Sequence, residues 1–213
     1  MKSLLKQVAH VIATALVAPL MLPELLAQRV AGRDVWFHTQ TELLSLVPGK
    51  IGLYVRGAYY HRMLRRCPLG CGFQFGTIIN LEAEFGERVC SGANVRIGVA
   101  TVGDDCIISG GAHILSGKFS HGVTDPTVPF NKQPPSVARV HLGRNCWVGA
   151  NAVVMADIGE NCIVGAGAVV TRPFPSDKII LGNPARAIAD TFDPKLIEGR
   201  KVNAMASPKM PAA

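Results

Sequence analysis

The chain has 213 residues and a net charge of +7, and 48% of its residues are hydrophobic while only 17% are charged. This composition excludes a disordered chain and a coiled coil, and the length fits one domain with an elaboration. The basic balance favours anionic partners such as nucleic acid, acidic lipid or a phosphate-bearing ligand. The nearest basic cluster, Arg62 to Arg66, lacks interleaved aromatic residues and any known reading motif. We therefore expect no nucleic-acid partner.

The chain opens with two lysines, and an apolar stretch from Val11 to Leu22 follows, interrupted by Pro19. This stretch is shorter than the roughly 18–20 residues that cross a bilayer. A signal peptide would need a small-x-small cleavage site, and none is convincing after Ala27. The segment is predicted to be a helix, kinked at Pro19 and Pro23, that packs on a partner or lies against a membrane surface.

Residues 29–74 mix charged, aromatic and aliphatic side chains without a clean period. A helix is predicted from about Gly52 to Arg66, after the breaking pair Pro48-Gly49. Its tyrosines are interpreted as packing residues, with an acceptor pocket as the alternative: Tyr54, Tyr59 and Tyr60.

From about residue 85 an aliphatic residue, followed by glycine or another small residue, recurs every six positions. The fifth positions read Cys, Ala, Cys, Ala, Cys, Ala along the three blocks 102–114, 142–154 and 158–170. Six is neither the helical period of 3.6 nor the strand period of 2. It is typical of a stacked β-solenoid, in which each unit is a short strand and a corner. The first-position aliphatic residues and the small fifth-position residues are predicted to fill its interior.

The cysteines of this chain are interpreted as structural. Cys106, Cys146 and Cys162 occupy equivalent repeat positions, which predicts small buried thiols in a reducing, cytoplasmic compartment. Cys67 and Cys71 have the spacing of a zinc half-site, but no second pair with matching spacing follows. An even number of cysteines is weak support for a disulfide framework in so long a chain.

The repeat resembles that of the hexapeptide-repeat acyltransferases, and so does the closing segment AVVTRPFPSDKIILGNPARAI at 168–188. The resemblance implies a mainly β fold: a left-handed parallel β-helix, with an N-terminal helical segment and a protruding loop. It implies a helical and irregular extension over 1–74, the acyltransferase domain over 75–190 with a loop at 117–138, and a C-terminal tail over 191–213. It also implies a homotrimer. One departure is visible, because Val154 and Ile158 are four positions apart rather than six.

The loop at 117–138 interrupts the repeat with four prolines and no period. A long irregular loop on a regular scaffold is usually functional. His121 in this loop matches the family's catalytic histidine, and imidazole suits proton removal from a hydroxyl or an amine near neutral pH; the alternative is a surface histidine without a role. Asp125 is a candidate to orient the ring, as is a carbonyl group or water. His113 is the weaker base candidate and a possible acceptor contact.

The resemblance implies acetyl-CoA as the acyl donor, bound in a groove between neighbouring subunits. The tryptophan of the family's (V/C)W(I/V)G sequence would flank this groove, or else is an outward packing aromatic. Alanine backbone groups would contact the pantetheine arm and the thioester, and cations would hold the phosphates. The matched residues are Trp147, Ala150 and Ala166 on the thioester side and Thr171, Arg172 and Arg186 on the nucleotide side.

The reaction that the resemblance implies is direct transfer. His121 takes the proton of the acceptor as its oxygen attacks the thioester carbon, and the backbone N–H of Ala150 stabilises the oxyanion. The stretch SLVPGKIGLYVRGAYYHRMLRRC at 45–67 resembles acyltransferases of polysaccharide and cell-surface glycan biosynthesis. A sugar hydroxyl is therefore the expected acceptor, with amino-sugar nitrogen left open.

Two other functions remain open at this point. A β-helix scaffold without catalysis predicts no affinity for CoA. Some proteins of this shape are γ-type carbonic anhydrases, which bind zinc through three histidines, two of them in a His-x4-His arrangement. Here His113 and His121 are eight positions apart with a loop between them, so we expect no metal site. The location expected is cytoplasmic, with membrane contact through the N-terminal helix as an open alternative.

Overall fold

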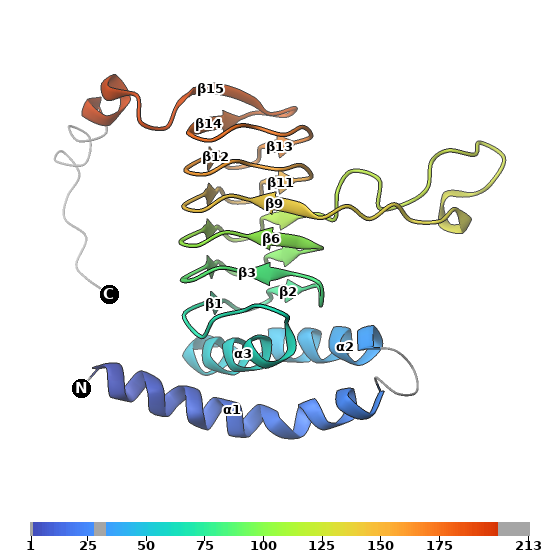
Figure 1. Ribbon diagram of the computed structural model, residues 1–213, viewed down its shortest axis with the longest axis vertical. Coiled ribbons are helices and arrows are strands. Elements are labelled where there is room, and N and C mark those ends of the chain that lie inside the picture. Colours follow the sequence, from blue (N-terminus) through green and yellow to red (C-terminus); the bar gives the residue numbers. More distant parts are fainter. Residues whose placement is uncertain (1, 28–32, 200–213) are drawn as a thin grey trace.

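The computed structural model describes residues 2–27 and 33–199, and it shows a stack of short strands standing on three helices (Figure 1). The helices are α1 (Lys2–Ala27), α2 (Arg33–Ser45) and α3 (Gly49–Met63). The chain above them winds into a left-handed parallel β-helix, which confirms the predicted fold class. A loop projects far to one side of this solenoid, and its outer part contains the 3-10 helix η1 (Phe130–Lys132).

Three sheets form the sides of the solenoid. The first sheet contains β1 (Gly72–Phe73), β4 (Cys90–Ser91), β7 (Ile107–Ile108), β10 (Trp147–Val148), β12 (Ile163–Val164), β14 (Lys178–Leu181) and the antiparallel β15 (Arg186–Asp190). The second sheet contains β2 (Ile78–Ile79), β5 (Arg96–Ile97), β8 (His113–Ile114), β11 (Val153–Val154) and β13 (Val169–Val170). The third sheet contains β3 (Glu84–Phe85), β6 (Ala100–Val102) and β9 (Val140–Leu142).

The six-residue period builds the interior as predicted. The second residue of each two-residue strand points inward, so that Ile108, Val148 and Val164 stack in register and are fully buried. Their outward neighbours in β7 and β10, Ile107 and Trp147, are about half exposed. This alternation within a two-residue strand follows from the opposite directions of successive side chains.

The four-residue spacing at Val154 to Ile158 recurs at Val170 to Phe174. The third side of the solenoid shrinks there to single bridges that join Leu142 to Ile158 and Ile158 to Phe174. The departure seen in the sequence is therefore a regular shortening of one side rather than a break in the stack.

The cysteines of the repeat are core residues, as expected. Cys106, Cys146 and Cys162 are almost completely buried. Each thiol donates to a backbone carbonyl of the next coil, at 3.1 Å for Cys106, 3.0 Å for Cys146 and 3.2 Å for Cys162. Sulfur is small enough for this crowded corner and also satisfies a buried carbonyl, which alanine cannot do.

At the corners of the solenoid, several polar residues adopt the left-handed backbone conformation. Asn145 and Asn161 have φ of 55° and 57°. The Asn145 amide donates to Asn161 Oδ1 at 2.9 Å, and the Asn161 amide donates to Asp177 Oδ1 at 2.9 Å. Asparagine tolerates this conformation better than most side chains, and here the side chains also link successive coils.

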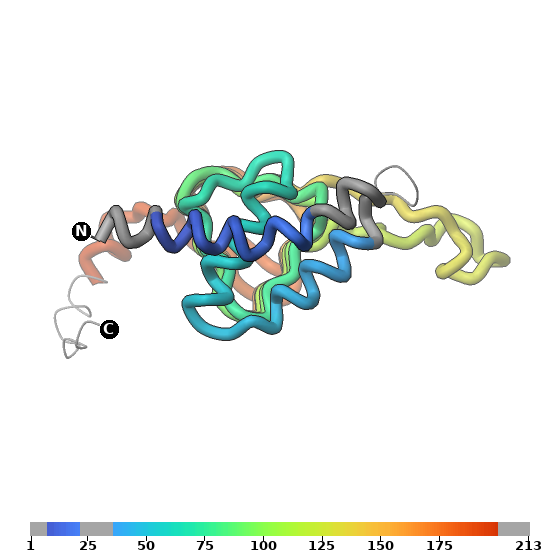
Figure 2. The backbone as a smooth tube through the Cα atoms, turned by 90° about the horizontal axis from the view of Figure 1, so that it is seen from below, coloured from blue at the N-terminus to red at the C-terminus, as the bar shows by residue number. Residues whose placement is uncertain are grey.

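The helices close the lower end of the solenoid (Figure 2). The predicted N-terminal helix is confirmed as α1, which continues through Pro19 and Pro23, and the predicted helix near 52–66 is α3. The expected packing role is confirmed for Tyr59 and Tyr60, which are fully buried between the helices and the first coil. Tyr60 meets Phe73 of β1 edge-to-face, with ring centroids 5.3 Å apart.

Arg56 of α3 is a buried charge that joins the helices to the solenoid. Its guanidinium donates to the carbonyls of Leu44 at 2.8 Å, Val47 at 2.7 Å and Phe73 at 2.9 Å. Burial lowers the pKa of Arg56 from its usual value. These bonds fix the end of α2 and the first strand against α3, because removal of the arginine would leave buried carbonyls without donors.

Candidate active site

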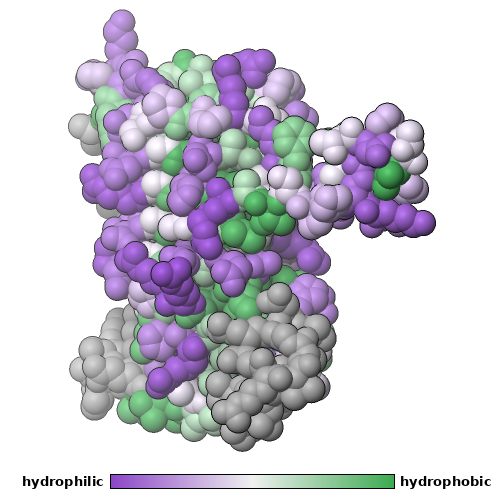
Figure 3. All heavy atoms as spheres, turned by 45° about the vertical axis from the view of Figure 1, so that its right-hand side comes forward, coloured by the Kyte–Doolittle hydropathy of each residue, from purple (hydrophilic) through white to green (hydrophobic). Residues whose placement is uncertain are grey.

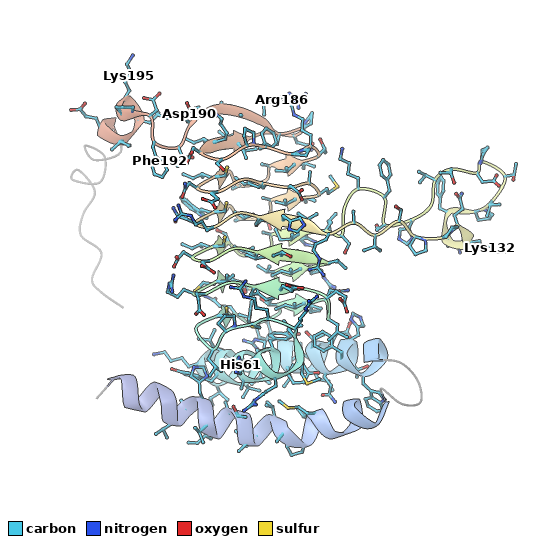
Figure 4. All side chains as sticks on the ribbon, viewed as in Figure 1. His61, Lys132, Arg186, Asp190, Phe192 and Lys195 are labelled. Carbon is cyan, nitrogen blue, oxygen red and sulfur yellow. The ribbon has the colours of Figure 1, made fainter. Side chains whose placement is uncertain are left out.

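The projecting loop leaves the solenoid between β8 and β9. Its neck is held by two backbone hydrogen bonds, from Ala138 N to Ser116 O at 3.0 Å and from Ser136 N to Phe119 O at 3.2 Å. Gly117 begins the turn outward with φ of 83°, a conformation that glycine adopts without strain. Lys132 lies in the outer part of the loop, at the end of η1 (Figure 4).

Gln133 organises the outer part of this loop. Its side-chain oxygen accepts from the amides of Thr124 and Asp125 at 3.0 and 3.2 Å, and its amide nitrogen donates to the carbonyls of Asp125 and Val128, both at 2.8 Å. The Gln133 side chain is buried, whereas most of its neighbours in the loop are exposed. One polar side chain thus replaces the hydrophobic core that the loop lacks.

His121 lies on the solvent-exposed outgoing arm of the loop. In the part of the chain that the structure describes, its imidazole makes no hydrogen bond or ion pair. Asp125, the predicted orienting residue, accepts instead from the amide of Thr127 at 2.8 Å and from its hydroxyl at 2.6 Å. These bonds lower the pKa of Asp125. Asp125 therefore closes its own turn within this chain, and an orienting contact with His121 is not among its interactions.

A cleft of about 280 Å3 lies beside the base of the loop, on the outer face of the second sheet. Ser120 lines this cleft, so the loop brings the residue next to His121 to its edge. His113 also lines the cleft. From the sequence, this residue was predicted as a possible acceptor contact. Figure 3 shows that this side of the solenoid mixes hydrophilic and hydrophobic residues beneath the projecting loop.

Two further cleft residues, Arg96 and His38, were missed from the sequence. Arg96 in β5 stands directly beside His113, because β5 and β8 pair with these residues in register. Arg96 occupies the same hexad position as His113, one coil earlier in the chain. This equivalence was a sequence signal from which Arg96 could have been identified. His38 comes from α2, and only the packing of the helices under the solenoid brings it to the cleft.

The predicted thioester residues lie on β10 and at the corner between the first and second sheets. The Trp147 indole is half exposed and donates to Ser109 Oγ at 3.0 Å. Ala150 and Ala166 stack on successive coils, since Gly167 N donates to Ala150 O at 2.8 Å. Among the described residues the N–H of Ala150 has no acceptor, and the residue is exposed. The geometry thus leaves this amide free to donate to a ligand.

The predicted nucleotide residues lie on the last coils. Arg172 is exposed, with its guanidinium carbon 5.4 Å from the centroid of the Phe174 ring. Thr171 precedes it, directly after β13. Arg186 lies at the end of the solenoid opposite the helices, where its guanidinium donates to the carbonyl of Ala185 at 3.0 Å (Figure 4). Two exposed cations are therefore present near the upper end of the solenoid.

One chain does not bring the base and the donor residues together. The loop with His121 follows the end of β8, whereas Ala150 precedes the start of β11 in the same sheet. The loop and Ala150 therefore lie at opposite ends of the strands of the second sheet.

No group of three or more histidine, cysteine or acidic side chains among the residues described is placed to hold a metal ion. Cys67 and Cys71 are buried beneath the first coil. The hydrogen bond that the two thiols share, together with burial, raises the pKa of Cys67 above its usual range. Both observations agree with a structural role for this pair.

No helix in the described ranges is long and apolar enough to cross a membrane. One face of α1 packs on α3 through the buried Ala13 and Val17, and the opposite face is apolar and exposed. Its large exposed side chains are Val8, Val11, Ile12 and Leu16, which have relative exposures of 49%, 70%, 55% and 62%.

Comparison with known proteins agrees with this architecture. Residues 139–172 match a family described as the hexapeptide repeat of succinyl-transferase. No curated protein matches the chain in sequence. A maltose O-acetyltransferase from Clostridium difficile 630 has a similar structure, with a TM-score of 0.65, 17% identity, and coverage of 74% of this chain and 86% of the other.

A hexapeptide-repeat acetyltransferase from Vibrio cholerae, VCA0836, is also similar. Its TM-score is 0.60 at 19% identity, and the match covers 74% of this chain and 92% of the other. The same Vibrio protein complexed with acetyl coenzyme A has a TM-score of 0.58 at 16% identity, with coverage of 78% and 92%. At these identities the likeness establishes the shared fold.

Proposed function

We propose that this hexapeptide-repeat β-helix protein is an acyl-CoA-dependent O-acyltransferase, which transfers an acetyl group from acetyl-CoA to a hydroxyl of a sugar or glycan. The observation that carries the proposal is an exposed loop histidine, His121, next to a residue of a polar cleft, on a solenoid whose corner exposes an unpaired amide at Ala150. The acetyl-CoA complex of the similar Vibrio protein supports the donor. Amino-sugar nitrogen is the alternative acceptor.

The mechanism needs one base and one oxyanion donor. His121 removes the proton of the acceptor hydroxyl as its oxygen attacks the thioester carbon. The N–H of Ala150 donates to the oxyanion that forms on the thioester oxygen. The carbon–sulfur bond then breaks, and the His121 imidazolium returns its proton to the CoA thiolate. The acyl group passes directly between the substrates, so no enzyme-bound acyl intermediate forms.

The donor site is built from the flat corner and the cations above it. Ala150 and Ala166 allow the pantetheine arm to approach the backbone, because no long side chain stands in its way. Trp147 flanks this path, with its indole already fixed by the bond to Ser109. Thr171, Arg172 and Arg186 receive the adenine and phosphate end, where guanidinium groups form charge-assisted hydrogen bonds.

We infer that the working form is a homotrimer in which His121 of one copy meets the donor corner of another. The position of these groups at opposite ends of the strands of the second sheet supports this inference. The loop projects away from its own solenoid (Figure 1). This projection also supports the homotrimer, because it places the loop where a neighbouring copy would stand.

The proposed location is the cytoplasm, where acetyl-CoA is available and thiols stay reduced. The exposed apolar face of α1 supports a further contact, with an acidic membrane surface. A helix with such a face lies in the interface plane rather than across the bilayer. The net charge of +7 favours anionic lipid over neutral lipid.

Calorimetric titration with acetyl-CoA and with CoA tests the proposed function without knowledge of the acceptor. We expect one site per chain with a dissociation constant on the order of 10 μM, close to −7 kcal/mol. Absence of binding to folded, ligand-free protein would contradict the acyltransferase and favour a scaffold without catalysis. Metal analysis of the same sample addresses the carbonic anhydrase, which requires bound zinc.

A further inference from the structure

The cleft beside the loop is unusual in its charge. Its lining contains one arginine and two histidines, Arg96, His113 and His38, together with polar and aliphatic groups. No acidic side chain is among the lining residues. His38 pairs at 3.2 Å with Glu42, which lies outside the lining.

Arg96 differs from two other exposed arginines of the solenoid, Arg88 and Arg144. Arg88 pairs with Asp105 at 2.6 Å, and Arg144 pairs with Glu160 at 2.8 Å. Each of these carboxylates stands one coil above its arginine. The position one coil above Arg96 holds His113, and Arg96 has no ion pair within the described part of the chain. Arg96 and His113 therefore place two cationic or hydrogen-bonding groups one above the other, where Arg88 and Arg144 each face a carboxylate that balances the charge.

We propose that the cleft holds an anionic group of the acceptor, a carboxylate or a phosphate, through the Arg96 guanidinium. This inference rests on the proposed function and specifies its substrate class: the acceptor is an acidic sugar or glycan. The planar guanidinium donates two parallel hydrogen bonds to either anion. Ser120 and His113 lie on the same cleft, so the anion would be bound beside the arm that carries His121.

Thermal unfolding of the full chain with small anions tests this inference. The probes are sodium glucuronate and glucose 6-phosphate, with glucose as the neutral control, all at matched ionic strength. The variants are Arg96→Gln and Arg144→Gln, which remove the same charge, the second at a corner remote from the cleft. Arg96→Gln should fold, because this side chain is exposed and makes no ion pair with a described residue.

At concentrations about tenfold above the dissociation constant, we expect an anion to raise the midpoint by roughly 3–6 °C, and glucose to have no effect. Arg96→Gln should lose this shift and Arg144→Gln should keep it. The probe that gives the larger shift, glucuronate or glucose 6-phosphate, identifies the preferred anion as carboxylate or phosphate. A shift with glucose equal to that with glucuronate, or a shift that persists in Arg96→Gln, would overturn the inference.

A parallel titration with CoA separates this inference from the proposed function. If CoA stabilises the protein and neither anion does, the acidic acceptor is wrong while the acyltransferase stands. If the anions act through Arg96 and CoA has no effect, the anion site stands and the acyltransferase is wrong. Arg96→Lys keeps the charge but not the planar fork, so we expect it to retain part of the shift.

Discussion

The solenoid and its loop are held together in opposite ways. Each solenoid coil hydrogen-bonds to the next and buries an unbroken column of aliphatic side chains, among them Ile108 and Val148. In the loop over residues 118–138, Gln133 is the buried side chain, and it makes four hydrogen bonds to the loop backbone. A region with few buried contacts opens locally at low free-energy cost. The chain thus separates a rigid scaffold from a movable arm that carries the proposed base.

The largest expected effect is on the chemistry of that arm. His121→Ala should lower acetyl transfer by about 10²–10⁴-fold, because general base catalysis by a positioned side chain contributes that much. The dissociation constant for CoA should stay unchanged, since the donor residues belong to the solenoid. Thiol release from acetyl-CoA and calorimetry measure the two quantities.

His141→Ala is the matched control for this variant. His141 is an exposed histidine in β9, on the third sheet, and it should keep full activity. A parallel loss of CoA binding and transfer in His121→Ala would contradict the general-base assignment and point to a structural role.

The second largest effect is expected on the stability of the solenoid. Two adjacent isoleucines there differ in whether the side chain points into the solenoid or out to solvent. Ile108 is fully buried and Ile107 is 54% exposed. Ile108→Ala should lower the free energy of unfolding by about 2–5 kcal/mol, through lost burial and the cavity left behind. Ile107→Ala should change it by less than about 0.5 kcal/mol, as for ordinary surface positions. Urea denaturation of both variants measures the difference, and similar losses would mean that the outer face of the first sheet is also buried in the assembly.

A smaller effect is expected in the loop itself. Gln133→Ala removes four hydrogen bonds that hold the outer part of the loop. We expect faster proteolytic cleavage within 118–138 and a several-fold loss of transfer, with the midpoint of thermal unfolding nearly unchanged, because the loop opens separately from the solenoid. Asn131→Ala, an exposed position of the same loop, is the control. A drop in the midpoint equal to that of Ile108→Ala would show that the two regions unfold together.

The same contrast explains what the sequence could predict. A buried column with a fixed period leaves its pattern in the residues, so a stacked β-solenoid and the interior place of Cys106, Cys146 and Cys162 follow from spacing, whereas its left hand came from the family resemblance. The loop has no period, and only the resemblance to a known family singled out His121. Its spacing to Asp125 suggested a pair, yet that carboxylate bonds to Thr127, two residues away, because a short polar side chain readily closes its own turn.

Contacts between elements distant in the sequence could not be predicted. Arg56 is charged and lies in a helix without a clear apolar period, but three backbone carbonyls from α2, the connection after it and β1 allow its burial. His38 reaches the cleft only through helix packing, and Arg96 becomes its neighbour through strand register. These placements depend on tertiary structure. Outside the repeat, the local sequence carries no signal for such contacts.

The smallest effect is expected at the helical base, on the outward face of α1. Leu16 is 62% exposed on this face, and a glutamate there would place a charge where the proposed acidic membrane surface binds. Leu16→Glu should lower co-sedimentation with vesicles of phosphatidylcholine and phosphatidylglycerol several-fold, through lost apolar burial and added repulsion. Ile188→Glu, at a 60% exposed position of β15 at the other end of the solenoid, should bind as the unmodified chain does. Equal binding of all three proteins, or binding to pure phosphatidylcholine that matches binding to the acidic mixture, would exclude the α1 face as an acidic-membrane contact and leave the helix to its role as the cap beneath α3.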